Sequence, residues 1–399
     1  MFKKLIYKLF FSIPIIKRLK DENKLIKDKI SQLTSTPIHE INTTLHKLEN
    51  KILSLESKIN IISGERADFI IPFWYEWNFH EPNVQHALID LCKPADTVFD
   101  VGANAGALSL LMSRLVGIKG VVYSFEASRR IVDKTAYNLA VNGCGNIQLM
   151  HNAVYKNSGE VIEVFEGRDL NDSIIMHEWD KGHSGMKVST IALDDFVEKW
   201  KAVPTVVKMD IEGAEFDAVL GFQKTIETHK PHLILEQNCD DTKCFEFLMN
   251  KGYKAIDLSI YELVDSNEKF KSLSSVANVL FIHESKIADT PYSNLKKILL
   301  KKIQGKGEKG IELSPGRYIF ELKMSASNSD NEIMMGIKNE NGKIFNYHSN
   351  TNFLCQCYKY WVINLENQSH VTPFFEFLNN TYDPTFKVEE IIIFKLQSF

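Results

Sequence analysis

The chain has 399 residues, of which 44% are hydrophobic and 25% are charged, so it has the composition of an ordinary soluble protein with about two to three domains. Its net charge of −4 lacks the strong basic balance of nucleic-acid-binding proteins, and we expect no nucleic-acid partner. The six cysteines show neither the paired spacing of a zinc site nor that of a disulfide framework, which favours reduced thiols in a cytoplasmic protein.

The first part of the chain, residues 1–35, is basic and contains many apolar side chains. Residues 1–20 carry six basic side chains and no acidic one. The longest uncharged stretch, Leu9–Ile16, is much shorter than the ~20 residues of a membrane-spanning helix, and Lys8 divides the apolar region that a secretory signal would need. We therefore expect a basic amphipathic helical segment that lies peripherally on an anionic membrane, at its inner face. A helix that packs on a partner protein, or a frayed tail, is the alternative.

Residues 36–63 carry an uninterrupted heptad pattern. Isoleucine or leucine recurs at positions 38, 41, 45, 48, 52, 55, 59 and 62. Thr36 and Pro37 suit the N-cap and first position of a helix. Isoleucine at most a positions, with leucine at half of the d positions, favours a parallel two-stranded coiled coil, so we expect a homodimer. An amphipathic helix packed on its own domain is the alternative.

A glycine-containing turn between two apolar runs predicts a binding site. The first run ends in Asp100, and Gly102 and Gly106 then allow a tight turn against a ligand before a helical pattern begins. The second run ends in Glu126, where a carboxylate can accept hydrogen bonds from the hydroxyls of a ribose. Asn104 has a side chain where a dinucleotide site would hold its pyrophosphate. The spacing therefore suits a cofactor with an amino acid end and no phosphate, such as S-adenosylmethionine, and we expect these residues to bind it.

From about residue 90 the chain alternates strand-like and helix-like patterns, which predicts an α/β fold with a parallel, doubly wound sheet covered on both faces. We expect strands at 97–101, 121–125, 147–154, 205–210, 231–237, 253–257 and 276–283. We expect helices at 105–116, 128–142, 213–220 and 241–251. In such a sheet ligands bind beyond the carboxyl ends of the strands, so the acids at those ends are the residues to consider.

An insertion at 155–192 interrupts this alternation. It contains two short alternating segments, 161–165 and 187–191, with a polar stretch between Arg168 and Gly185. A long irregular loop of this kind is typical of a lid or a binding loop. His177 and His183 within it suit a base or a ligand, or are simply solvated.

Two more strands end in acidic residues, Asp210 and Glu236. A hydroxyl group becomes a good nucleophile only as it loses its proton, and a nearby carboxylate can accept that proton. Carboxylates at neighbouring strand ends also raise one another's pKa, which favours this role. We expect Asp210 to be the catalytic base or to orient the hydroxyl, with Glu236 as the second candidate. Lys208 is expected to neutralise a buried acid, whereas Glu212 and Glu215 are also explained as complements to the N-terminus of the helix that they open.

Several ordered motifs together resemble the FkbM family of S-adenosylmethionine-dependent methyltransferases. The resemblance covers roughly residues 80–283 and rests on the segments Asp100–Gly106, Phe125–Ser128, Thr190–Phe196 and, above all, Lys208–Glu215. It implies a Rossmann-like class I methyltransferase fold and an O-methyltransferase acting on hydroxyls of sugars, polyketides and related metabolites. The chain has Gln237 where the family often has a histidine, a departure that bears on the role of Glu236.

Two other assignments leave alternatives open. Asp210, Glu236 and Asn238 offer the oxygen ligands of a Mg²⁺ site, but no other signature of a hard cation accompanies them, and we expect no metal. Asn152 follows the third strand, where its amide could reach the adenine of the cofactor or form a turn. We include Asn152 among the expected cofactor-binding residues.

The tail, residues 305–399, has short strand-like runs and no helical pattern, which predicts a β-sandwich. The runs are 317–324, 333–337, 359–363, 372–377 and 386–395, and Asn341 with Gly342 is a hairpin signal. The first and last runs resemble strands of jelly-roll carbohydrate-binding modules. Aromatic residues here could stack on sugar rings or form the core: Tyr347, Tyr358, Tyr360, Trp361 and Tyr382. The lysine- and glycine-rich segment Lys296–Lys309 predicts a linker.

These patterns predict four parts: the basic segment 1–35, a coiled coil at 36–63, a methyltransferase domain at 65–290 and a β-sandwich at 305–399. The expected function is S-adenosylmethionine-dependent O-methylation of a hydroxyl on a sugar, glycan or glycolipid intermediate. The alternative is a non-catalytic scaffold that keeps the methyltransferase fold and works by coiled-coil assembly and glycan binding. The intact Asp100, Glu126 and Asp210 disfavour the scaffold, which would not need them.

Overall fold

The computed structural model describes residues 81–165, 185–273, 275–304, 310–325, 333–340, 344–350, 357–365, 367–377 and 387–397. The predicted basic segment 1–35, the coiled coil 36–63 and the loop residues His177 and His183 lie outside this part of the chain. Tyr382 and the side chains of Tyr347, Tyr358 and Tyr360 also lie outside it.

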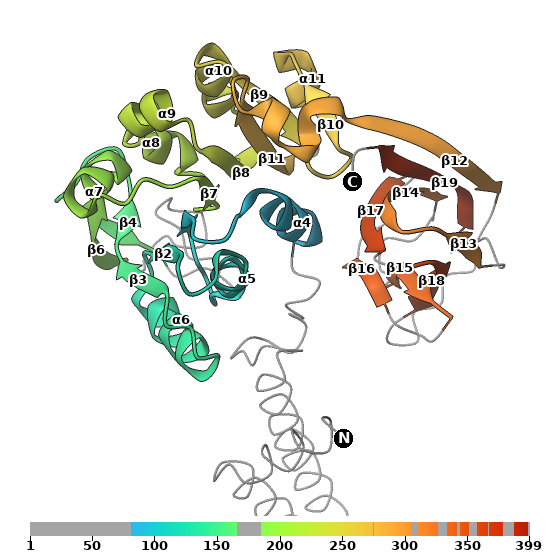
Figure 1. Ribbon diagram of the computed structural model, residues 1–399, viewed down its shortest axis with the longest axis horizontal. Coiled ribbons are helices and arrows are strands. Elements are labelled where there is room, and N and C mark those ends of the chain that lie inside the picture. Colours follow the sequence, from blue (N-terminus) through green and yellow to red (C-terminus); the bar gives the residue numbers. More distant parts are fainter. Residues whose placement is uncertain are drawn as a thin grey trace, which may run out of the picture. The chain divides into compact units, whose positions relative to one another are not determined.

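The centre of the α/β domain is an eight-stranded sheet in the order β10-β9-β11-β8-β7-β1-β2-β3 (Figure 1). Its strands are β1 (Thr97–Val101), β2 (Val121–Glu126), β3 (Ile147–His151), β7 (Val206–Met209), β8 (His232–Asn238), β9 (Tyr253–Asp257), β10 (Glu262–Val264) and β11 (Val276–His283). The run from β3 through β2, β1 and β7 to β8 is parallel. This is the Rossmann-like arrangement expected from the sequence.

The expected wholly parallel sheet is wrong at one edge. β11 lies antiparallel between β8 and β9, and β10 pairs antiparallel with β9, so the sheet is mixed. β11 is buried along most of its length, and a strand buried on both faces has the same apolar run whichever direction it takes. The sequence pattern therefore located the strand without fixing its direction.

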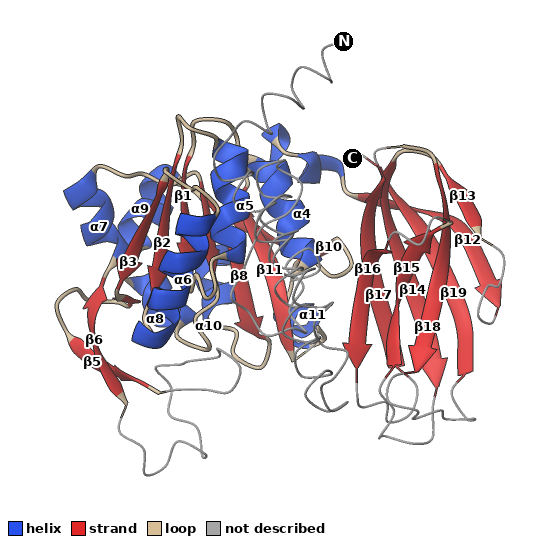
Figure 2. Ribbon diagram, turned by 90° about the horizontal axis from the view of Figure 1, so that it is seen from below, coloured by secondary structure: helices blue, strands red, loops and turns tan. Residues whose placement is uncertain are grey.

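Helices cover both faces of this sheet (Figure 2). They are α4 (Pro82–Leu91), α5 (Ala107–Val116), α6 (Arg129–Val141), α7 (Leu193–Trp200), α8 (Glu215–Leu220), α9 (Gln223–His229), α10 (Lys243–Asn250) and α11 (Asn267–Lys271). Alternate residues of β1 point to opposite faces: Phe99 packs in the core cluster with α7 to α10, and Val98 packs in the cluster with α4 and α5. None of the helices among the described residues is long and apolar enough to cross a membrane.

A small sheet stands beside the main one and contains β4 (Ala153–Val154), β6 (Met186–Ile191) and β5 (Val161–Val164) in that order. The strand expected at 147–154 is therefore divided at Asn152 into β3 and β4, which belong to different sheets. β5 and β6, the two short segments expected in the insertion, pair with each other antiparallel.

The C-terminal region is a sandwich of two four-stranded antiparallel sheets, as expected from the sequence. One contains β12 (Lys296–Gln304), β19 (Lys387–Gln397), β14 (Gly316–Ser325) and β17 (Cys357–Leu365), and the other contains β13 (Ile311–Leu313), β18 (Ser369–Phe377), β15 (Ile333–Asn339) and β16 (Ile344–Asn350). Side chains of both sheets share one buried cluster. Trp361 is fully buried in that cluster, so its role in the core is confirmed.

The predicted linker at Lys296–Lys309 is wrong for its first nine residues, because Lys296–Gln304 is strand β12, paired along its length with β19. The lysines suggested a solvated linker, but lysine is also common on an edge strand, where its side chain stays in solvent while the backbone pairs with the neighbouring strand. The hairpin signal at Asn341 and Gly342 is supported by the antiparallel pairing of β15 with β16, the strands on either side.

Candidate active site

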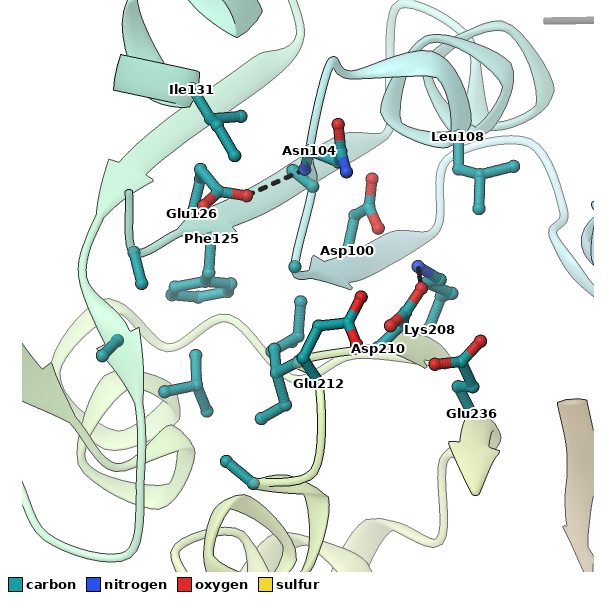
Figure 3. Close-up of a pocket in the computed structure, with 18 of the residues that line it drawn as sticks. Asp100, Asn104, Leu108, Phe125, Glu126, Ile131, Lys208, Asp210, Glu212 and Glu236 are labelled. Carbon is teal, nitrogen blue, oxygen red and sulfur yellow. Dashed lines mark hydrogen bonds and ion pairs between the residues drawn. The ribbon is translucent and has the colours of Figure 1, made fainter. Parts of the chain in front are cut away.

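A pocket of about 260 Å³ opens at the carboxyl ends of β1, β2, β7 and β8 (Figure 3). Glu126 and Asn104 lie on one side of it, and Lys208, Asp210 and Glu236 lie on the other. It is lined by Glu81, Asp100, Val101, Gly102, Ala103, Asn104, Ala107, Leu108, Phe125, Glu126, Ala127, Ile131, Asn152, Ala153, Val154, Val164, Lys208, Asp210, Ile211, Glu212, Ala214 and Glu236. The fold thus brings seven of the eight predicted site residues to one cavity.

Glu126 is held in a fixed orientation at the end of β2. Its Oε2 accepts a hydrogen bond of 2.9 Å from the backbone N–H of Asn104, and its Oε1 accepts one of 2.9 Å from the backbone N–H of Ser128. The side chain is almost buried, at 7% exposure. Backbone donors on both oxygens leave the carboxylate little rotational freedom, so its remaining lone pairs are presented in a defined direction.

Asp100 is completely buried at the end of β1. Its Oδ2 accepts a hydrogen bond from the Ser109 hydroxyl, whereas its Oδ1 is buried and has no hydrogen-bond partner in the described part of the chain. Burial raises the pKa of Asp100 to about 6, against the opposing charge of Lys208. A buried acceptor in a pocket wall without a partner is suited to a donor on a bound ligand.

The two glycines of the turn have different roles. Gly102 has φ = 79°, and a Cβ there would lie 1.8 Å from the backbone oxygen of Asp210, so only glycine allows the turn to contact the end of β7. Gly106 does not line the pocket; a Cβ there would lie 3.1 Å from Thr135 and 3.3 Å from Leu139 of α6. Gly106 therefore serves the close approach of two helices rather than direct contact with a ligand.

Asn152 lines the pocket at the junction of β3 and β4. Its Nδ2 donates a hydrogen bond of 3.2 Å to the backbone oxygen of Ser189 on β6. The amide thus ties the small sheet to the pocket wall.

Lys208 is a buried cation among carboxylates. Its Nζ lies 3.1 Å from Asp210 Oδ2 and 4.0 Å from Glu81 Oε2, with 4% of the side chain exposed. Burial alone would lower the pKa of Lys208, but the charges of Asp210, Glu81 and Asp100 together raise it above its usual value. Lys208 thus forms an ion pair with an acid, as expected from the sequence, but that acid, Asp210, is only partly buried, with 23% of its side chain exposed.

Glu236 completes the acidic side of the pocket. Carboxylate oxygens of Glu81, Asp210 and Glu236 lie within 4.8 Å of one another. Burial and the charges of Asp210 and Glu81 raise the pKa of Glu236 to about 8, and a hydrogen bond to Asp210 acts in the same direction. A pKa of about 8 favours the protonated form of Glu236 at neutral pH, in which it can donate a hydrogen bond to Asp210. We call Glu81, Lys208, Asp210 and Glu236 the acid–lysine cluster.

The ligand set that the sequence suggested for a metal is not assembled as expected. Asn238 does not line the pocket, and its Oδ1 accepts a hydrogen bond of 3.0 Å from the backbone N–H of Asp240. Glu81 stands in its place as the third oxygen-bearing side chain. The ammonium group of Lys208 already supplies a positive charge to these carboxylates.

Glu215, beside the pocket, complements the start of its own helix. Its Oε1 accepts hydrogen bonds from the backbone N–H groups of Ile211 (2.9 Å) and Gly213 (3.3 Å). Burial raises the pKa of Glu215, with these hydrogen bonds opposing. The interpretation of Glu215 as a helix-terminus residue fits this geometry.

Strained backbone collects at the pocket. Of the seven non-glycine residues with positive φ in the described part of the chain, three line it: Glu81 (45°), Asn104 (49°) and Glu212 (54°). A left-handed conformation at such a residue costs about 1–3 kcal/mol and persists where the surroundings fix it, which is typical of functional sites.

A comparison with protein families agrees with this geometry. Residues 100–254 match the family model "Methyltransferase FkbM domain". This match identifies residues 100–254 as an FkbM methyltransferase domain. The match begins at Asp100 and includes Asp210 and Glu236, and so spans both sides of the pocket.

Individual relatives of the FkbM domain are distant. The chain is 29% identical over 87 residues to a protein-L-isoaspartate O-methyltransferase of Methanococcoides burtonii, which covers 21% of this chain and 43% of that protein. It is 31% identical over 88 residues to a ribosomal protein L11 methyltransferase of Caldanaerobacter subterraneus, which covers 22% of this chain and 28% of that protein. The chain thus spans less than half the length of these curated relatives.

Among solved structures, the chain is similar to the methyltransferase FkbM of Methylobacillus flagellatus, with 17% identity, 51% of each chain covered and a TM-score of 0.31. It is also similar to the fibrillarin of Aeropyrum pernix, which was solved with natively bound S-adenosyl-L-methionine, with 13% identity, 52% of this chain and 76% of that chain covered, and a TM-score of 0.31.

Sequence reasoning missed Glu81 as a residue of the pocket in the FkbM domain. It lies outside the motifs, immediately before Pro82, and reaches the pocket because α4 packs on the sheet. The one signal that the sequence offers is proline at the first position of a helix, which marks the preceding residue as an N-cap. That signal locates the helix start but says nothing of what it faces.

Proposed function

We propose that this protein is an S-adenosylmethionine-dependent O-methyltransferase that acts on a hydroxyl of a sugar, glycan or glycolipid intermediate. The observation that carries the proposal is a single pocket with Glu126 on one side and the acid–lysine cluster on the other. A cofactor bound across it would have its nucleoside at Glu126 and its sulfonium group toward Asp210.

The cofactor side fits the chemistry of S-adenosylmethionine. The fixed carboxylate of Glu126 can accept hydrogen bonds from both ribose hydroxyls. The open acceptor Asp100 Oδ1 suits the ammonium group of the amino acid end, and Asn152 is a candidate for the adenine. Together these contacts recognise the two polar ends of the cofactor.

The acid–lysine cluster fits the acceptor chemistry. The cofactor, when bound, supplies a methyl group that is already activated by its sulfonium. The remaining task is to align the acceptor oxygen and to take up its proton as the new C–O bond forms. Asp210, held by Lys208 at 3.1 Å, can accept that proton, and protonated Glu236 can hold Asp210 by the hydrogen bond that they share.

The charge of the cluster favours a hydroxyl acceptor over a carboxylate. With Glu236 protonated, the carboxylates of Glu81 and Asp210 face the single ammonium group of Lys208, so this part of the pocket has a net negative charge that repels anions. A relative named as a protein-L-isoaspartate O-methyltransferase would by that name act on a carboxyl-bearing residue. An acceptor with several hydroxyl groups suits the acid–lysine cluster better, which supports a sugar.

Titration calorimetry with S-adenosylmethionine tests the proposal directly. We expect binding by the wild type, and binding that is abolished or greatly weakened in Glu126→Ala and in Asp100→Ala. Glu163→Ala, which removes an exposed carboxylate on β5, is the control and should bind as the wild type does. Absence of binding in the wild type would favour the scaffold, and unchanged affinity in both pocket variants would refute the assigned cofactor site.

The class of acceptor is tested by methyl transfer from radiolabelled S-adenosylmethionine. We expect transfer of a radiolabelled methyl group to glycolipid or oligosaccharide extracts, in a product that resists alkaline hydrolysis as an ether does. A product that releases its label in alkali would be an ester and would contradict a hydroxyl acceptor.

A further inference from the structure

Helix α4 begins in the pocket. Its N-cap residue, Glu81, has the left-handed conformation already noted (φ = 45°), and Pro82 occupies its first position. Glu81 lies in the acid–lysine cluster, yet it is outside the matched family region of residues 100–254. Its place in the pocket therefore depends on how α4 is held.

Two contacts hold Glu81 within the pocket. Its Oε1 accepts a hydrogen bond of 2.9 Å from Asn278 Nδ2, and its Oε2 lies 4.0 Å from Lys208 Nζ. Asn278 is the direct partner of Glu236 in the pairing of β11 with β8. The amide of Asn278 thus places the Glu81 carboxylate next to Glu236.

The last turn of α4 carries Asp90, which is bound by the β-sandwich. Arg317 of β14 donates two hydrogen bonds to Asp90, from Nη1 to Oδ2 at 2.6 Å and from Nη2 to Oδ1 at 2.9 Å. The Arg317 and Asp90 side chains are only 3% and 9% exposed. The hydroxyl of Tyr292 donates to the same Oδ2 at 2.8 Å, and the guanidinium group lies 5.6 Å from the centre of the Tyr261 ring.

Apolar packing joins the same surfaces. Val84, Leu88 and Leu91 of α4 belong to one buried cluster with side chains of the sandwich: Ile319, Val362 and Leu396. The two parallel hydrogen bonds of an arginine–carboxylate pair fix the position of α4 relative to β14, whereas apolar contacts alone are non-directional and would allow the helix to shift.

We infer that Glu81 is a positioning residue of the acid–lysine cluster, and that the β-sandwich holds it there through the Arg317–Asp90 pair at the other end of α4. A strained N-cap needs surroundings that fix it, and α4 is fixed at both ends by polar contacts of defined geometry. The sandwich would then stabilise the geometry of the pocket, in addition to any binding of a glycan. The inference rests on the proposed function for the meaning of the cluster, but its geometry can be tested without an acceptor.

The test measures the pKa of Glu236 by carbon NMR of the full-length protein labelled at glutamate carboxyl groups, with Glu236→Gln to assign the signal. The negative charge of Glu81 is one cause of the raised pKa of Glu236, so Glu81→Gln should lower that pKa by on the order of one pH unit. Displacement of α4 should also lower the pKa of Glu236, because it moves the charge of Glu81 away from Glu236. We therefore expect a downward shift in the double variant Asp90→Asn with Arg317→Gln, which leaves no unpaired buried charge, and in Asn278→Leu.

Lys323→Met is the matched control, because Lys323 also lies on β14 and forms an ion pair at 3.2 Å, but with Glu389 of the sandwich itself. It should leave the pKa of Glu236 unchanged. Should the double variant unfold, Arg317→Lys keeps the charge without the two parallel hydrogen bonds and should give a smaller shift in the same direction.

An unchanged pKa of Glu236 in Glu81→Gln would overturn the role of Glu81. A shift in Glu81→Gln but none in the folded Arg317 and Asp90 variants would overturn the role of the sandwich. Binding of S-adenosylmethionine should stay within a few-fold of wild type in the Arg317, Asp90 and Lys323 variants, because these residues do not line the pocket. Loss of binding in the wild type would instead count against the proposed function.

Discussion

Asp210 and Glu236 are neighbouring carboxyl groups with different surroundings. Asp210 has the ammonium group of Lys208 at 3.1 Å, whereas Glu236 has burial and two like charges, which raise its pKa to about 8. Such a difference separates a group that accepts a proton from one that holds a proton. At the scale of single residues, the pocket therefore has one candidate base and one candidate donor.

If Asp210 is the base, Asp210→Asn keeps the size of the side chain but removes its capacity to take a full proton. We expect methyl transfer to fall by a factor on the order of 10² to 10⁴, with S-adenosylmethionine still bound. Labelled-methyl transfer and calorimetry measure the two effects separately. Asp240→Asn, at an exposed acid after β8, should have no effect. Turnover within a few-fold of wild type in Asp210→Asn would transfer the role of base to Glu236.

The raised pKa of Glu236 also predicts how stability depends on pH. Between the usual value of 4.5 and about 8, the folded state holds a proton that the unfolded state has lost, so stability falls as pH rises through this window. The raised pKa of Asp100 is about 6, so the stability that depends on its proton is already largely lost once the pH has risen to about 7. We expect the melting temperature to fall between about pH 7 and about pH 9, and to fall less in Glu236→Gln.

Scanning calorimetry of both proteins at the two pH values provides the measurement. Taking the difference between the two proteins removes the effects of all other titrating groups. Equal falls in melting temperature would mean that Glu236 is already ionised in the folded protein at neutral pH.

At the scale of elements, the pocket depends on the contact between the turn after β1 and the end of β7. Gly102 N–H and Ala103 N–H both donate to the backbone oxygen of Phe125, and Asp210 N–H donates to the backbone oxygen of Val101. The turn, β2 and β7 are therefore tied by backbone hydrogen bonds, and the absence of a side chain at Gly102 lets them meet. This contact brings the cofactor side and the acid–lysine cluster into one cavity.

Gly102→Ala tests this contact. The new Cβ would lie 1.8 Å from the Asp210 oxygen, so the turn must move, and we expect loss of S-adenosylmethionine binding together with a lower melting temperature. Gly159→Ala is the control, since Gly159 has φ = 82° but no atom within 4 Å of the added Cβ. It should cost only the strain of the left-handed backbone, about 1–2 kcal/mol, and leave binding intact. Equal effects of the two variants on binding would show that the contact with β7 is unimportant.

At the scale of the whole molecule, we propose that the heptad seam at 36–63 assembles the protein as a parallel dimer and that the basic segment 1–35 contacts an anionic membrane. Both proposals rest on the sequence pattern. They fit an enzyme whose acceptor is carried on a lipid, because two membrane-binding segments on one dimer bind a surface more tightly than one.

The dimer is tested by light scattering of the full-length protein. We expect the mass of a dimer, and the mass of a monomer for Leu48→Asp combined with Leu55→Asp, which places charges at two d positions of the seam. Lys47→Asp combined with Ser54→Asp changes charge outside the a and d positions and should leave the dimer intact. A monomeric wild type would refute the proposed coiled coil.

The sequence by itself determined the strands whose apolar runs are long and the motifs at their ends. The strands that end in Asp100, Glu126, Asp210 and Glu236 were located because strand, turn and helix signals are local, and the matched spacing of the motifs predicted the FkbM family. The β-sandwich followed from short alternating runs in the same way.

Tertiary structure decided what depends on contacts between distant segments. Strand pairing set the antiparallel direction of β11 and formed the strand at Lys296–Gln304. Helix packing set the burial of Gly106. A local sequence pattern does not identify these partners. Glu81 enters the pocket because α4, 10 residues long, packs between the sheet and the sandwich. A side chain acquires its role in such a site from neighbours about 200 residues away, as with Asn278, and only the folded chain brings them together.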